Sequence, residues 1–170
     1  MIIDHFIQAN NIRPADAIVV QKQKFGILDH YVIYLGVGSD GEHKFIANYT
    51  SGIRFLSYLL IFDYLRSYVP IKLNRFVGDD NQRQWAVTRA LSRLNENSYH
   101  LILNNCEHFK NYVHYGVEKS EQVEGLGKAL TIGGIGLAAA GAASKNDRVA
   151  AVGLFSTVLG LIAIGLSERK

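Results

Sequence analysis

Two long apolar runs near the C-terminus constrain the fold of this chain more than any other feature. They cover residues 129–143 and 149–166, and the only three charges in residues 129–166 lie in the short segment between them. The second run is 18 residues long, close to the roughly 20 residues that a helix needs to cross a bilayer. Neither run has the polar face of a typical soluble helix. We therefore predict a helical hairpin in or on a membrane.

Small residues are expected to let the two helices approach closely. The candidates for this contact are Gly133, Gly136, Ala140, Gly153 and Gly160. The same runs are also compatible with two buried helices packed on the rest of the chain, or with a surface for self-association.

The rest of the chain has the composition of a folded domain. Seventeen of the 18 aromatic residues precede Lys128, which predicts a domain over residues 1–120 and a hydrophobic tail over 121–170. The net charge is only +3. This mild basicity disfavours a dedicated nucleic-acid binder and suits an anionic lipid surface.

Cysteine content and the N-terminus bear on the compartment. Cys106 is the single cysteine, so no disulfide can form within the chain and a metal site with several thiolate ligands is excluded. No His pair has the spacing of zinc ligands, and we expect neither a metal nor a cofactor. Residues 1–5 carry no basic or long apolar segment, so we expect no secretory signal and an intracellular, membrane-associated location.

The first 117 residues predict a mixture of strands and helices. Runs of β-branched and aromatic residues predict strands at 17–20, 28–35, 43–49, 53–60, 69–75 and 99–103, with 63–67 a weaker candidate. Helical periodicity predicts helices at 82–95 and 106–116. The expected fold class is α+β, an antiparallel sheet with helices on one side, plus the C-terminal apolar hairpin.

Cys106 lies where a predicted strand passes into a predicted helix. Asn104 and Glu107 have the spacing of an N-cap and its capping box. Cysteine would then occupy the first turn, where the helix dipole favours the thiolate and lowers the thiol pKa. The alternative is an inert buried cysteine.

His30 is the best candidate for a base, because it interrupts an otherwise apolar strand. A hairpin centred near Ser39 places Asn48 opposite His30, where an amide could orient the imidazole. His43 would face Leu35 instead. These residues predict a Cys-His-Asn site of Cys106, His30 and Asn48, whereas His114 is expected in solvent.

Two stretches resemble the lecithin retinol acyltransferase-like domain, a permuted branch of the NlpC/P60 papain-like superfamily. They are residues 30–36 (HYVIYLG) and 99–109 (YHLILNNCEHF). Residues 13–16 (RPAD) look like the family's Pro-Gly-Asp opening, with alanine in place of glycine, and residues 89–94 (RALSRL) resemble the helix before the cysteine. The resemblance covers residues 13 to about 117.

The resemblance implies a thiol acyltransferase or phospholipase A that acts on glycerophospholipids. It makes Cys106 the nucleophile that forms an acyl-thioester and His30 the general base. The family's third residue is often a histidine in the return strand, and Asn48 stands there in this sequence. The implied partners are a phospholipid substrate and a membrane surface, which the loop residues Lys22, Lys24 and Phe25 could touch.

Two other classes of function stay open. A thiol peptidase or amidase of the wider superfamily would have little use for the apolar tail. A non-catalytic membrane-active protein would keep its effect on bilayers after Cys106→Ala, whereas an enzyme would lose its activity.

Overall fold

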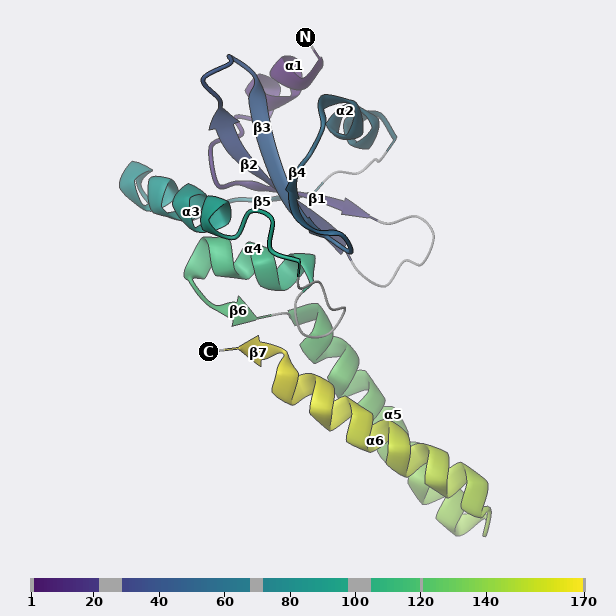
Figure 1. Cartoon of the computed structure of the whole chain (residues 1–170). Coiled ribbons are helices and arrows are strands. Elements are labelled where there is room, and N and C mark those ends of the chain that lie inside the picture. The colour runs from purple at the N-terminus through teal and green to yellow at the C-terminus, as the bar shows by residue number, and fades with distance from the viewer. Residues whose placement is uncertain (1, 22–28, 68–71, 98–104, 120, 170) are drawn as a thin grey trace. The chain divides into compact units, whose positions relative to one another are not determined.

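The chain divides into two compact units, Met1–Val117 and Glu118–Lys170. The computed structural model describes residues 2–21, 29–67, 72–97, 105–119 and 121–169. Within these ranges the first unit is α+β and the second is a helical hairpin (Figure 1). The predicted α+β class with a C-terminal apolar hairpin is confirmed.

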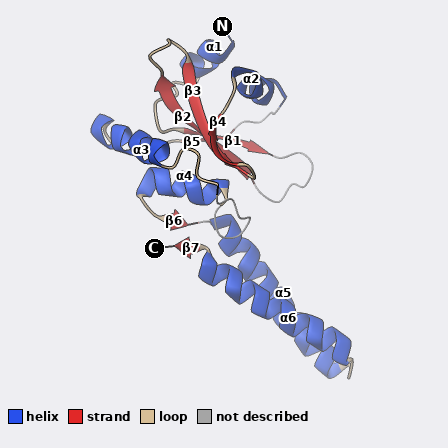
Figure 2. Cartoon of the chain, viewed as in Figure 1, coloured by secondary structure: helices blue, strands red, loops and turns tan. Residues whose placement is uncertain are grey.

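The first unit is built on an antiparallel sheet with the strand order β4-β3-β2-β1-β5 (Figure 2). The strands described are β1 (Ala17–Gln21), β2 (Asp29–Val37), β3 (His43–Tyr49), β4 (Gly52–Phe55) and β5 (Lys72–Asn74). Most follow the predicted ranges closely. The strand predicted at 99–103 lies outside the described residues, as do Lys22, Lys24 and Phe25.

Helices cover both faces of this sheet. The helices described are α1 (Ile2–Ala9), α2 (Tyr58–Ser67), α3 (Asp80–Ser92) and α4 (Cys106–Tyr115). Ile33 on one face clusters with Ala86 of α3 and Phe109 of α4. Val32 on the other face clusters with residues of α1 and α2. The prediction of helices on one side therefore describes α3 and α4, while α1 and α2 add a second covering layer.

Helix α2 replaces part of a predicted strand. The prediction of strand over 53–60 is wrong beyond Phe55, and residues 63–67 are helical. Aromatic and branched residues suggested a strand here, but the Ser57 hydroxyl accepts from the Leu60 backbone N–H at 3.3 Å, as an N-cap does. Burial of Ile61 in the sheet's α1–α2 cluster then stabilises the helix.

Asp16 ties the start of β1 to the segment before α3. Its side chain is 1% exposed and accepts from Arg83 Nη1 at 2.8 Å and from Arg75 Nη1 at 3.0 Å. The backbone N–H groups of Phe76 and Arg13 also donate to it, each at 3.0 Å. Burial opposes the charge, but these hydrogen bonds outweigh it and lower the pKa of Asp16.

The residue before Asp16 adopts a backbone conformation that favours glycine. Ala15 has a φ of 73°, in the left-handed region where glycine carries no steric penalty. The His114 ring lies against it, with Nε2 2.8 Å from the Ala15 carbonyl oxygen. His114 is only 5% exposed, so its predicted exposure to solvent is wrong. Burial lowers the pKa of His114 to about 4.

The second unit is an antiparallel pair of long apolar helices, α5 (Glu121–Ala143) and α6 (Asp147–Leu166). Both are long and apolar enough to cross a membrane, judged by length and composition alone. Two short strands, β6 (Glu118–Lys119) and β7 (Glu168–Arg169), pair antiparallel and bring the two ends of the hairpin together.

Glycines line the contact between α5 and α6, but they are only partly those predicted. A Cβ on Gly134 would lie 2.6 Å from the Gly153 carbonyl oxygen, and one on Gly160 would lie 2.5 Å from that of Gly127. At Gly133 and Gly136 a Cβ would meet open space. The prediction is therefore right for Gly153 and Gly160. It is wrong for Gly133, Gly136 and Ala140, because the helix phase turns those three outward.

Candidate functional site

Cys106 is the first residue of α4 and is 6% exposed. The N-cap before it is Asn105, whose side-chain oxygen accepts from the backbone N–H groups of Glu107 at 2.9 Å and His108 at 3.0 Å. The His108 ring completes the capping box. The predicted cap on Asn104 is thus one residue too early, because the extended backbone at Asn105 aims its amide at these N–H groups. Cys106 stands in the first turn, as predicted.

Helix α4 is also anchored at its other end. Arg89 of α3 donates to the Val113 carbonyl oxygen through Nε at 3.0 Å and Nη2 at 2.6 Å. A cation at this place satisfies a terminal carbonyl and complements the helix dipole. Gly116 then ends the helix in a left-handed conformation, with a φ of 76°. The element that carries Cys106 is therefore held at both ends.

Asn48 of β3 reaches the peptide that precedes the cysteine. Its side chain is 1% exposed, and Nδ2 donates to the Asn105 carbonyl oxygen at 3.4 Å. The same oxygen accepts the first helical hydrogen bond, from Phe109 N at 3.1 Å. The sheet thus fixes the backbone carbonyl just before Cys106 through Asn48.

The predicted pairing of Asn48 with His30 is off by one residue. Ile33 pairs with Ile46 in the β2–β3 ladder, one position later than predicted. Continued along the strands, this register puts Tyr49 opposite His30. Their rings are in contact, with centroids 4.9 Å apart.

The register shift has two physical sources. The Gly38 N–H donates to the Glu42 carbonyl oxygen at 2.8 Å, so the turn centres one residue later than predicted. A bulge between Tyr34 and Gly36 then adds a residue to β2. The β2–β3 register therefore differs from the predicted one by two residues next to the turn and by one residue beyond the bulge. A one-residue slip of this kind moves each side chain to a new cross-strand partner.

His30 is 7% exposed, and its ring lies 6.4 Å from that of Tyr64 as well as beside Tyr49. The pKa of Tyr49 is raised, first by burial, then by Tyr64 and by the charge of Cys106. Tyr49 therefore has the His30 ring as a neighbour and lies within reach of the charge of Cys106. A direct contact between the Cys106 thiol and the His30 imidazole stays a prediction.

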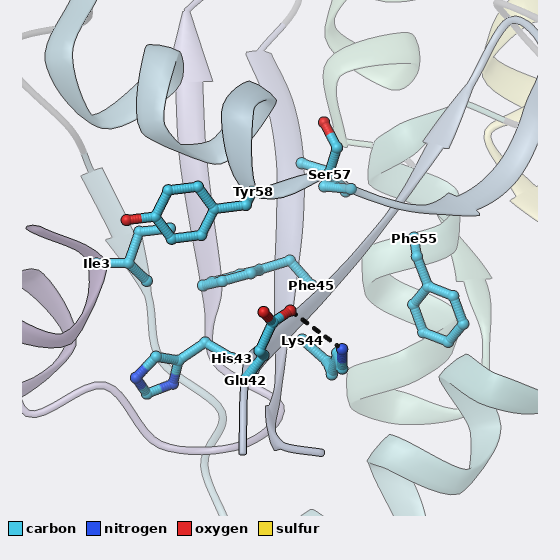
Figure 3. A pocket seen from close by; sticks show the side chains of 9 residues that line it. Ile3, Glu42, His43, Lys44, Phe45, Phe55, Ser57 and Tyr58 are labelled. Carbon is cyan, nitrogen blue, oxygen red and sulfur yellow. Dashed lines mark ion pairs between the residues drawn. The ribbon is translucent and has the colours of Figure 1, made fainter. Parts of the chain in front are cut away.

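A cavity of about 300 Å³ lies on the α1–α2 face of the sheet and does not coincide with the predicted site (Figure 3). Its lining is Ile3, Glu42, His43, Lys44, Phe45, Phe55, Leu56, Ser57 and Tyr58, so none of the three predicted site residues borders it. His43 pairs with Val37 instead of the predicted Leu35. Its ring nitrogens lie 2.7 Å from the Tyr34 hydroxyl and 3.1 Å from Asp4 Oδ1.

Metal-ligating side chains do not gather in the described residues. No group of three or more His, Cys, Asp or Glu side chains there could hold a metal ion.

Comparison with known proteins bears on the region around α4. Residues 60–119 match the family model described as "Lecithin retinol acyltransferase", and this range contains Cys106. Over this segment the chain is similar to that family. The segment matched by the family model leaves out His30 and Asn48.

A mouse protein is similar to a short stretch of this chain. It is named "Phospholipase A and acyltransferase 3" [Mus musculus] and is 54% identical over 43 residues. That stretch is 25% of this chain and 26% of the relative. The match thus spans about a quarter of each protein.

Proposed function

We propose that this chain is a thiol-dependent phospholipid acyltransferase or phospholipase A that works through an acyl-cysteine intermediate at a membrane. The observation that carries the proposal is the place of Cys106, the first residue of α4 inside the segment that matches the acyltransferase family. A thiol at the positive end of a helix dipole is suited to react as a thiolate.

The first half of the reaction forms a thioester. His30 takes the proton from the Cys106 thiol, and the sulfur attacks the carbonyl carbon of a phospholipid ester. The ester C–O bond breaks, and the leaving alkoxide takes the proton from His30 to depart as a lysophospholipid. The acyl group is then bonded to the sulfur of Cys106.

The second half of the reaction removes the acyl group. Water, or an acceptor amine or alcohol, gives its proton to His30 and attacks the thioester carbonyl. The C–S bond breaks, and the thiolate returns to the end of α4. Water as acceptor gives phospholipase activity, and an amine or alcohol gives acyl transfer.

Asn48 is the third member of the proposed site. Its hydrogen bond to the Asn105 carbonyl oxygen at 3.4 Å supports a role in holding the backbone that carries Cys106. The α4 dipole would stabilise the negative charge first on the thiolate and then on the oxyanion of the tetrahedral intermediate.

The hairpin of α5 and α6 would keep the folded unit at its lipid substrate. Large apolar side chains such as Phe155 (66% exposed) and Ile132 (72% exposed) cover its outer surface. Contiguous exposed apolar surface of this kind marks a membrane or interaction site. A soluble amidase has no comparable need for it.

The test measures lysophospholipid and free fatty acid released from phosphatidylcholine vesicles by the full chain and by Cys106→Ser. We expect release by the wild type and a loss of more than 100-fold in the variant, with unchanged thermal unfolding. Release that survives Cys106→Ser would contradict the proposal. If neither protein releases product while both permeabilise the vesicles, the chain is a non-catalytic membrane-active protein.

A further inference from the structure

The hairpin has its small residues inside and its large apolar residues outside. The buried glycines are Gly127, Gly134, Gly141, Gly153 and Gly160. They recur every seven residues within each helix, so that backbone packs against backbone along the whole contact. The large side chains point away from the partner helix, and those more than half exposed are Ile132, Ile135, Val152, Leu154, Phe155, Val158, Leu161 and Ile162. A water-soluble helix pair has the opposite arrangement.

Two threonine hydroxyls within the apolar segment are satisfied inside their own helices. Thr131 Oγ1 donates to the Gly127 carbonyl oxygen at 2.8 Å, and Thr157 Oγ1 donates to that of Gly153 at 2.9 Å. Backbone and hydroxyl groups that are paired within a segment remove a main cost of placing that segment in hydrocarbon.

Charged residues are confined to the two ends of the hairpin. At the tip stand Lys145, Asp147 and Arg148, and at the base Glu121, Glu124 and Lys128. The pairing of β6 with β7 brings residues 118–119 and 168–169 together at the base. The second unit therefore has an apolar middle and two polar ends. One polar end is the base, where residues 118–119 and 168–169 flank the two helices, and the other is the tip.

The length of this hairpin matches a bilayer. The 20 residues of α6 extend about 30 Å at roughly 1.5 Å per residue, and the hydrocarbon core is about 30 Å thick. Helix α5 carries Lys128, which is exposed and paired with Glu124 at 2.5 Å. A lysine near the end of a spanning helix can extend its ammonium group to the interface, so its position is compatible with insertion.

We propose that α5 and α6 cross the bilayer as one tightly packed two-pass hairpin, with residues 144–146 on the far face. Residues 1–117 and the segment after Leu166 then share the near face, since both join the hairpin at its base. This proposal rests on the membrane attachment in the proposed function, but it does not depend on any catalytic step.

A hairpin lying flat in the interface fits these observations less well. An interfacial helix has a polar face that remains in water, whereas the exposed outer surfaces of α5 and α6 are apolar around their circumference. Lying flat would leave about half of that apolar surface in water. Crossing the bilayer buries all of it and leaves the charges at both ends hydrated.

The single cysteine of the chain allows a direct test. In a Cys106→Ser background, single-cysteine variants Glu121→Cys, Val158→Cys and Ser144→Cys mark the base, the middle and the tip. Each full chain is synthesised in the presence of sealed phosphatidylcholine–phosphatidylserine vesicles and treated outside with a membrane-impermeant maleimide. We expect labelling of Glu121→Cys, at least tenfold less labelling of Ser144→Cys until detergent is added, and no labelling of Val158→Cys in the intact vesicles.

Equal labelling of Ser144→Cys and Glu121→Cys in intact vesicles would overturn the two-pass arrangement. Labelling of Val158→Cys would overturn insertion altogether. All variants lack the thiol of Cys106, so this result is independent of whether the chain acylates. A chain that spans but lacks acyl chemistry would leave this inference standing and refute only the enzyme.

A matched pair of glycine variants tests whether the two helices insert as one unit. A Cβ on Gly134 would lie 2.5 Å from Thr157 N, whereas one on Gly133 would meet nothing within 4 Å. In the Ser144→Cys background, Gly134→Leu should lower the protected fraction at least twofold, and Gly133→Leu should leave it unchanged. Equal behaviour of the two variants would contradict the packed unit.

Discussion

The side-chain amide of Asn48 donates to the backbone carbonyl of Asn105 at 3.4 Å, which connects the third strand of the sheet to the N-cap of the cysteine helix. The carbonyl belongs to the peptide bond that joins Asn105 to Cys106. The position of the proposed nucleophile thus depends on a side chain more than 50 residues earlier in the sequence.

Replacing Asn48 by Ala should slow acyl-cysteine formation by about 10- to 100-fold, because small displacements of a nucleophile are costly. The loss of one hydrogen bond should destabilise the fold by only about 1 kcal/mol. Rates of lysophospholipid release and thermal unfolding separate the two effects. Asn48→Asp keeps the shape but removes the N–H donor, so activity that survives Asn48→Asp would show that the donor is not needed.

Replacing His30 by Gln should lower the rate by about 100-fold or more, the usual contribution of a general base. The ascending acid limb of the pH–rate profile should disappear with it. His43→Gln is the matched control, because His43 bonds to Tyr34 and Asp4 and has no part in the proposed chemistry. Equal losses in the two variants would argue against His30 as the base.

His114 should make the fold sensitive to acid. Its folded pKa of about 4 lies below its ordinary value of 6.5, so the folded state favours the neutral ring. The stabilisation is complete above pH 6.5 and is lost as the pH falls towards 4. The loss should approach about 3 kcal/mol, at roughly 1.4 kcal/mol per pKa unit. Chemical denaturation between pH 7 and 4 measures it.

The control for this pH dependence is His114→Gln, which keeps a donor towards the Ala15 carbonyl but does not titrate. Its free energy of unfolding should change much less between pH 6.5 and 4. An unchanged slope in the variant would assign the acid sensitivity to other groups.

Asp16→Asn should destabilise the first unit by about 3 kcal/mol, because it leaves Arg83 buried without its full charge partner. Asp80→Asn removes a carboxylate that pairs with Arg13 at the surface, and exposed pairs contribute about 1 kcal/mol or less. Urea denaturation of both variants compares them directly. Similar costs at the two positions would show that Asp16 does not organise this part of the fold.

Local patterns predicted most of the strands and helices. Residues 43–49 carry β-formers and follow a turn-forming stretch, and β3 has these bounds. The periodicity of residues 82–95 likewise marks α3. Helix α2 was missed because its aromatic and branched residues suit a strand as well, and only the cap at Ser57 and the burial of Ile61 decide for helix.

The neighbourhood of each site residue was harder to predict than its identity. Cys106 at a helix start follows from adjacent residues, but two asparagines in a row both suit an N-cap, and the extended backbone of Asn105 decides between them. The partner of His30 depends on a bulge near Gly36. Tyr49 and Tyr64 were missed because only the folded chain brings them to His30.

The central claim is that an acyl group is carried on Cys106. The most direct measurement is intact-protein mass spectrometry of the full chain, quenched in acid soon after mixing with phosphatidylcholine vesicles, followed by peptide mapping. The account predicts one added acyl mass on the peptide that contains Cys106, removed by neutral hydroxylamine and absent from Cys106→Ser. Lysophospholipid release or an acyl adduct that persists in Cys106→Ser would contradict it.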